Sequence, residues 1–94
     1  MIYFMMGEIT RLIKIGYCLD FRTFKVRLYN FKANSPERLW VLGTIEDGDE
    51  DMEESLHKKF QSVNNHNEWF DESTELLRFI FESRDCSPYE RLNL

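Results

Sequence analysis

The chain has 94 residues, a length that can bury one hydrophobic core but not two. Its hydrophobic fraction of 43% and aromatic fraction of 15% favour a folded domain and exclude an intrinsically disordered chain. No apolar run approaches the roughly 18–20 residues that span a membrane, and we expect no secretory leader. The sequence therefore predicts an intracellular protein that does not contact the membrane.

The two cysteines, Cys18 and Cys86, can form at most one disulfide bond. A reducing compartment is the simpler interpretation, in which both side chains remain free thiols. No set of cysteines and histidines has the spacing of a zinc site, so zinc is not expected.

The net charge of −5 is unevenly distributed along the chain. Residues 1–38 carry seven basic and three acidic side chains, whereas residues 39–94 carry five basic and fourteen acidic ones. A chain polarised in this way can present a basic face to nucleic acid although it is acidic overall. The alternative is that its helices alternate charge only for solubility.

Three segments have the pattern of β-strands. Residues 1–8 are dense in apolar and β-forming side chains, residues 11–18 alternate with period two, and residues 38–46 are again largely apolar. The short polar segment between the first two predicts an antiparallel hairpin. A short extra strand near residues 69–70 is an alternative that the pattern leaves open.

Three further segments have the period of α-helices, with apolar side chains three and four positions apart: residues 20–33, 49–61 and 73–83. Asp20 and Ser73 are suitable N-caps for the first and third of these. Acidic residues crowd the first turn of the second helix, where the helix dipole favours them.

The order of these elements predicts a small α+β domain over residues 1–83. We expect a central three-stranded antiparallel sheet flanked by helices, in the order β-β-α-β-α-α. Residues 84–94 are expected to form a C-terminal tail.

Six short motifs follow one another over residues 1–81: Ile2-Tyr3-Phe4, Ile13-Lys14-Ile15-Gly16-Tyr17, Arg27-Leu28, Ser35-Pro36, Glu53-Glu54-Ser55-Leu56-His57 and Glu68-Trp69-Phe70. In this order they resemble the GIY-YIG endonuclease superfamily. The resemblance is strongest to its compact branch, which contains phage proteins and domains of the meiotically upregulated gene type. It implies a GIY-YIG-like, metal-dependent hydrolysis of DNA, with RNA not excluded, in the cytoplasm of a cell or of a phage host.

The resemblance also implies roles for individual residues. Tyr3 matches the tyrosine of the first motif, although Met1 stands where the family has a glycine. Lys14 replaces the tyrosine of the second motif, and Tyr17 supplies a tyrosine just after the glycine Gly16. Tyr3 and Tyr17 are therefore the expected catalytic tyrosines.

Two helical residues complete the site that the resemblance implies. Counting back from the Ser35-Pro36 turn selects Arg27 as the family arginine, with Arg22 as the fallback. Glu53 matches the metal-binding glutamate, and His57, one turn later, either reaches the site or packs beneath it. The residues expected to contact nucleic acid are Lys14, Arg22, Lys25, Asn65 and Asn67.

These residue types suit phosphodiester hydrolysis. A tyrosine can accept the proton of the attacking water if its pKa is lowered. An arginine grips a phosphate with two planar donors. One carboxylate, that of Glu53, is enough for Mg²⁺ or Mn²⁺, which keep several waters and take further ligands from the substrate.

Two other functions remain open at the level of sequence. The chain can be a nucleic-acid-binding module whose catalytic site has decayed. It can also be a protein-interaction domain whose acidic segment, residues 46–54, docks on a basic partner. The oligomeric state, the cleavage preference and the biological pathway do not follow from the sequence.

Overall fold

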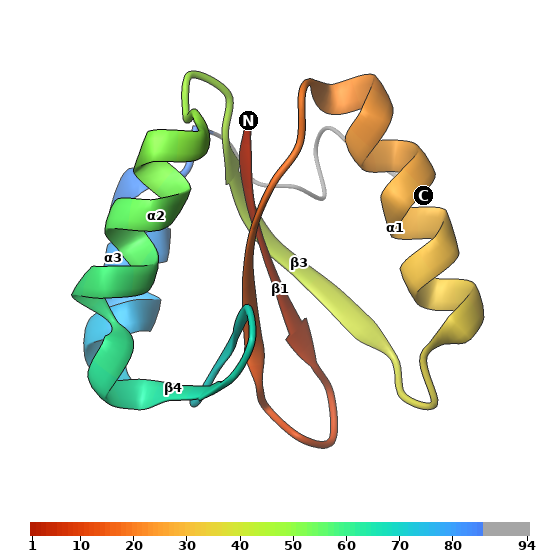
Figure 1. Cartoon of the computed structure of the whole chain (residues 1–94). Helices are drawn as coiled ribbons and strands as arrows, with labels where there is room; N and C mark the ends of the chain where they lie inside the picture. The colour runs from red at the N-terminus through yellow and green to blue at the C-terminus, as the bar shows by residue number, and fades with distance from the viewer. Residues whose placement is uncertain (86–94) are drawn as a thin grey trace.

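The computed structural model describes residues 1–85, which form an antiparallel sheet covered by helices (Figure 1). The strands are β1 (Ile2–Gly7), β2 (Ile13–Tyr17), β3 (Leu39–Ile45), β4 (Asn64–His66) and β5 (Trp69–Phe70). Their order across the sheet is β3-β1-β2-β5-β4, and every neighbouring pair is antiparallel.

Each α-helix begins after a residue whose side chain caps it. The helices are α1 (Phe21–Asn34), α2 (Glu50–Lys59) and α3 (Thr74–Ser83), and a 3-10 turn, η1 (Gln61–Val63), follows α2. Asp20, Asp49 and Ser73 accept hydrogen bonds from backbone amides three residues further on. None of the helices in the described residues is long and apolar enough to cross a membrane.

The helices cover opposite faces of the sheet, with α1 on one face and α2 and α3 on the other (Figure 1). The period-two alternation of β1 divides its side chains between them. Phe4 packs with Leu56 and Ile80 on the α2 and α3 face, and Tyr3 packs with Phe24 on the α1 face. Because both faces are covered, all six residues of β1 are buried.

The predicted α+β domain with an antiparallel sheet and three helices is confirmed, but the predicted number of strands was wrong. In the described residues the sheet has five strands, not three, and the order is β-β-α-β-α-β-β-α. β5 coincides with the alternative strand near residues 69–70. β4 has no apolar alternation to reveal it, since its sequence is Asn-Asn-His. The turn between them contains Asn67 at φ 50°, which asparagine tolerates well.

Arg84 and Asp85, which were predicted to belong to the C-terminal tail, are bonded to β3. The Arg84 guanidinium donates to the Leu42 carbonyl at 2.9 Å, and the Asp85 amide donates to the Thr44 carbonyl at 2.9 Å. The Glu46 amide donates to the Asp85 carboxylate. The remainder of the predicted tail, including Cys86, lies outside the described residues.

Cys18 is a buried free thiol in the described part of the chain. Its sulfur lies 3.5 Å from the carbonyl oxygen of Asp20, just before α1. Burial raises the pKa of the Cys18 thiol, so the side chain is an inert part of the core under the α1 face.

Tyr3 and Gly16 are paired across β1 and β2, and the tyrosine ring lies directly over the glycine. A methyl group added at Gly16 would lie 2.3 Å from Cζ and 2.5 Å from the hydroxyl oxygen of Tyr3. Such distances are far inside van der Waals contact. Gly16 is therefore required by the space that the ring of Tyr3 occupies, since no glycine in residues 1–85 has a positive φ.

We predict that Gly16→Ala lowers the free energy of unfolding by about 1–3 kcal/mol, because the ring of Tyr3 must leave its place. Urea denaturation measures the change. In a Tyr3→Leu background the same substitution should cost less, since the clashing atoms are absent. An equal loss in both backgrounds would contradict the packing argument.

Candidate active site

The outer edge of β2 is only partly covered by β5. Backbone pairing ends where the Ile15 amide donates to the Glu68 carbonyl at 3.0 Å. The carbonyl of Ile15 instead accepts from His57 Nε2 at 2.9 Å, and the carbonyl of Tyr17 accepts from Arg27 Nη1 at 2.7 Å. Side chains from α2 and α1, on opposite faces of the sheet, therefore bond to carbonyls two residues apart at the end of β2.

Arg27 connects this edge to Tyr3 beneath α1. Its guanidinium contacts the Tyr17 carbonyl and also hydrogen-bonds the Tyr3 hydroxyl. Tyr3 is only 1% exposed, and its ring centroid lies 4.9 Å from that of Phe24. Burial raises the pKa of Tyr3 to about 12, although the guanidinium acts in the opposite direction. The phenol is therefore neutral at physiological pH and is a hydrogen-bonding group.

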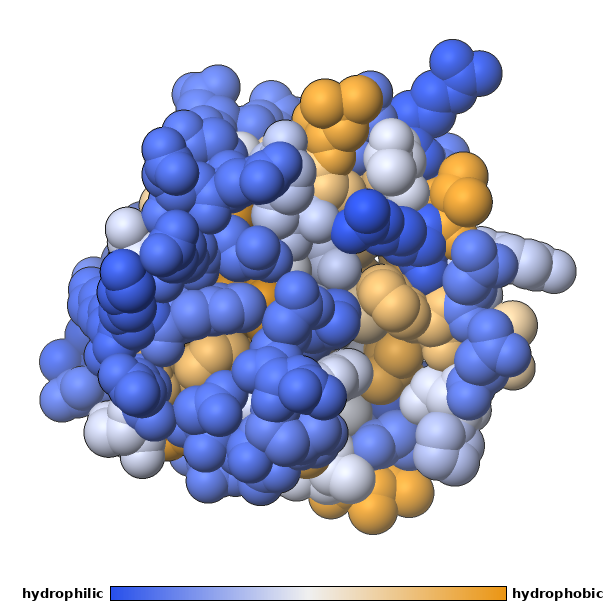
Figure 2. Space-filling model, in the orientation of Figure 1, coloured by the Kyte–Doolittle hydropathy of each residue, from blue (hydrophilic) through white to orange (hydrophobic). Residues whose placement is uncertain are grey.

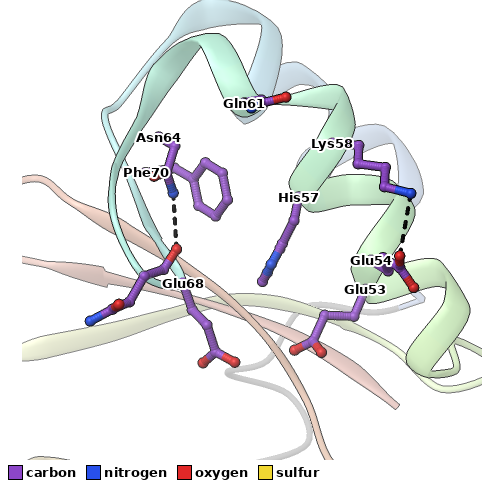
Figure 3. Close-up of a pocket in the computed structure, with 9 residues that line it drawn as sticks. Glu53, Glu54, His57, Lys58, Gln61, Asn64, Glu68 and Phe70 are labelled. Atoms are coloured by element: carbon purple, nitrogen blue, oxygen red, sulfur yellow. Dashed lines mark hydrogen bonds and ion pairs between the residues drawn. The ribbon is translucent and has the colours of Figure 1, made fainter.

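An open pocket of about 610 Å³ lies on the α2 side of the same edge. Figure 3 shows Glu53, His57 and Glu68 pointing into one space from α2 and from the residue before β5. The ring of Phe70 forms an apolar wall, 5.2 Å from the imidazole of His57. Because the carbonyl of Ile15 can only accept, the neutral imidazole carries its proton on Nε2 and can accept one only at Nδ1.

Glu53 is a partly buried carboxylate that faces a second negative charge. Burial raises the pKa of Glu53, and the carboxylate of Glu68 raises it further. His57 and the backbone of Tyr17 act in the opposite direction. A bound cation would stabilise the ionised form of such a carboxylate, which burial and the neighbouring negative charge disfavour. Carboxylates with perturbed pKa values concentrate at functional sites.

The donor set fits Mg²⁺ that keeps most of its water shell. Residues 1–85 contain no group of three or more histidine, cysteine, aspartate or glutamate side chains that could enclose a metal ion. Three carboxylates line the pocket, but Glu54 is paired with Lys58 at 3.3 Å and Glu68 with Lys14 at 2.7 Å, so Glu53 is the principal candidate ligand. Mg²⁺ commonly binds through one or two carboxylates together with substrate phosphates, so Glu53 can hold it.

Lys14 lies on the α1 face of β2 and is already paired. Its Nζ is 2.7 Å from a carboxylate oxygen of Glu68, and its side chain is only 12% exposed. Nζ also lies 5.2 Å from the ring centroid of Phe31 and 5.5 Å from that of Trp69. Lys14, which was predicted to contact nucleic acid, therefore holds Glu68 in place between the two faces.

The structure separates the other predicted residues. Asn67 lines the pocket, whereas Asn65 does not, because its amide donates to Asp71 at 2.9 Å on the exposed β4. Arg22 and Lys25 are exposed on α1 and contribute nothing to the pocket. Both lie on α1, the helix that also carries Arg27.

Tyr17 reaches the site through its backbone. Its carbonyl binds Arg27, while its side chain is half-buried against the core under α2 and α3. Asn64 and Glu68 line the pocket but were not predicted as functional residues. Glu68 could have been found from the sequence, because the alternation through Trp69 and Phe70 would orient it as Phe70 is oriented.

Comparisons with known proteins give no family for this chain: no protein-family model matches it, and no significant match is found among curated proteins or solved structures.

We predict that Tyr3 ionises near pH 12, above the ordinary tyrosine value of 10.0. Ultraviolet absorbance of tyrosinate measures this titration. Because the unfolded phenol ionises first, near its ordinary value of 10.0, stability should be lost as pH rises from 10.0 towards 12. Arg27→Gln should raise the pKa of Tyr3 further. Ionisation of Tyr3 near the ordinary value of 10.0 would contradict its burial.

We predict that Glu53→Gln stabilises the fold at neutral pH, because it removes a carboxylate whose charge is opposed by burial and by Glu68. In acid, where Glu53 is protonated in both the folded and the unfolded chain, the gain should vanish. Urea denaturation at the two pH values measures the difference. Asp51→Asn, at an exposed position of α2, is the matched control and should show no comparable gain.

Proposed function

We propose that this protein is a Mg²⁺-dependent endonuclease of the GIY-YIG type, which hydrolyses phosphodiester bonds in DNA. The supporting observation is that an arginine and a glutamate, from helices on opposite faces of the sheet, converge on one residue of β2. Arg27 donates to the Tyr17 carbonyl at 2.7 Å, and a backbone hydrogen bond from the same residue lowers the pKa of Glu53. The order of the sequence motifs supports the same function.

In this proposal Arg27 binds the scissile phosphate. One of its nitrogens is used by the Tyr17 carbonyl, and this bond fixes the plane of the guanidinium while further donors remain for phosphate oxygens. The neutral phenol of Tyr3 hydrogen-bonds the guanidinium and helps to fix its position. Glu53 holds Mg²⁺, which when bound supplies charge stabilisation and lowers the pKa of a coordinated water.

The proton acceptor is better assigned to His57 than to Tyr3. A base must bind a proton near the working pH, and the pKa of Tyr3 is shifted upward to about 12, opposite to the direction that the sequence-based role required. His57 presents Nδ1 as the accepting atom once Nε2 donates to Ile15. Imidazole is the side chain best suited to proton transfer near neutral pH.

The charge of α1 supports DNA as the partner. Between Phe21 and Asn34 the helix carries four basic residues and no acidic one, whereas α2 has three acidic residues in its first turn. We expect the phosphate backbone to approach from the α1 side and the metal ion from the α2 side. Because few phosphates are neutralised, duplex binding should be weak and should fall as salt increases.

The test is nicking of a supercoiled plasmid in Mg²⁺ or Mn²⁺. Glu53→Ala should abolish nicking while DNA binding is kept or tightened, since a negative charge facing phosphate is removed. Arg27→Ala should reduce nicking by roughly 100- to 1,000-fold, as expected for a donor that stabilises transition-state charge. Arg22→Ala should have a smaller effect, and Asp51→Asn should retain full activity.

A second candidate is a nucleic-acid-binding module that does not cleave. The raised pKa of Tyr3 and the pairing of Lys14 with Glu68 favour it, because both remove groups that could act on the substrate. Binding of DNA or RNA without nicking under any metal condition would establish this module and contradict the endonuclease. No binding to either nucleic acid at low salt would contradict both.

A further inference from the structure

A second hollow lies on the α1 face, beside the β4–β5 hairpin, and the proposed reaction does not use it. Its volume is about 470 Å³, within the range of sites that bind small organic groups. In the space-filling view the surface over α2 is mostly hydrophilic, whereas apolar side chains reach the surface between the sheet and α1 (Figure 2). We call this hollow the aromatic groove, after Phe31 and Trp69 in its lining.

The lining of the aromatic groove suits a flat, hydrogen-bonding ring. Phe31 comes from α1 and Trp69 from β5, so two aromatic side chains distant in the sequence meet there. Asn30 and Asn34 add side-chain amides, and the Asn34 amide already donates to the Asn30 carbonyl at 2.8 Å. Lys14 Nζ lies over both rings, so a base must stack on the ring surface that Lys14 leaves exposed. The acidic Glu37 also lines the groove, and its carboxylate accepts hydrogen bonds from Thr10. Aromatic rings stack on the faces of nucleobases, and asparagine amides pair with base edges.

One cation of α1, Arg27, lies on the same side of the helix as the residues that line the aromatic groove. α1 runs from Arg27, which contacts the end of β2, to Phe31 and Asn34, which line the groove. Three further cations and a 75% exposed aromatic side chain share the other exposed flank of the helix, three and four positions apart, and do not line the groove: Arg22, Lys25, Lys32 and Tyr29. A helix with no acidic residue is complementary in charge to a nucleic-acid strand.

We propose that the aromatic groove takes an unpaired nucleobase from a strand bound along α1, so that the protein prefers single-stranded or unpaired segments to perfect duplex. This inference rests on the proposed function for its choice of nucleic acid as partner, but it does not require cleavage. In a duplex the base faces are stacked on one another, and a base must be extruded at a cost in free energy before it can enter a groove.

The test follows the fluorescence of Trp69 in a Trp40→Phe background, where Trp69 is the remaining tryptophan. A short single-stranded oligonucleotide and a duplex of the same sequence are titrated in EDTA at low salt, so that no cleavage occurs. The single strand should quench Trp69 and bind more tightly than the duplex. Duplex binding that equals single-strand binding, or binding without quenching, would overturn the proposal.

Variants separate stacking from general folding effects. In the otherwise unchanged chain, Trp69→Leu should weaken single-strand binding by roughly 5- to 150-fold, whereas Trp69→Phe should keep most of it. Phe31→Leu gives a second, independent loss of one aromatic face. Phe81→Leu removes a half-exposed aromatic side chain from α3, on the other side of the sheet, and should change nothing. Circular dichroism confirms that each variant folds.

The outcomes distinguish this inference from the proposed reaction. One outcome combines quenching of Trp69 in the Trp40→Phe background, weaker binding by Trp69→Leu, and no nicking by the unmodified chain. It would support the aromatic groove and contradict the endonuclease. Nicking without any effect of Trp69→Leu or Phe31→Leu would support the endonuclease and overturn the groove. Sedimentation that reveals a dimer broken by Trp69→Leu would assign the groove to a second copy and would also overturn the proposal.

Discussion

The early end of backbone pairing along β2 is the constraint on which the site depends. β5 is only two residues long, so the carbonyls of Ile15 and Tyr17 have no strand beside them. Buried or half-buried carbonyls need partners, and His57 and Arg27 supply them from two helices. The bonds that complete the sheet are therefore the same bonds that orient the two side chains. A site built in this way is organised before any substrate arrives.

The sheet also separates two layers of opposite charge. α1 is purely basic, while α2 begins with acidic residues that the helix dipole favours. The two layers approach each other at the open edge of β2, where Arg27 and Glu53 both contact the backbone of Tyr17. The Lys14–Glu68 ion pair lies at the same boundary and links the α1 face to the pocket. An acidic protein can in this way offer a polyanion one favourable side.

The features that follow from local sequence were predictable. Asp20 and Ser73 were predicted as N-caps because capping and periodicity involve only neighbouring residues, and both cap their helices in the structure. The choice of Arg27 over Arg22 as the family arginine came from the resemblance and not from local sequence; in the structure it is Arg27 that hydrogen-bonds Tyr3. By contrast, the pKa of Tyr3 depends on packing against α1, which no local pattern encodes.

The β4–β5 hairpin marks the limit of prediction from sequence. Its strands are two and three residues long, too short for periodicity to be detected. Asn67 lines the pocket and Asn65 does not, because a turn with positive φ separates them and sets which side chains face the sheet edge. Glu68 was missed although alternation with Phe70 would have oriented it, and that alternation has meaning only because β5 pairs with β2.

The contacts of Arg84 and Asp85 with β3 affect whether the sheets of two molecules can pair edge to edge. β3 is the outermost strand on its side, and an uncovered outer strand is a template for another chain's strand. Arg84 and Asp85 occupy backbone groups of Leu42, Thr44 and Glu46, which alternate along that strand. Arg84 also fills the space over Gly43. The segment after α3 therefore occupies the second half of this edge, which hinders its pairing with a strand of another molecule.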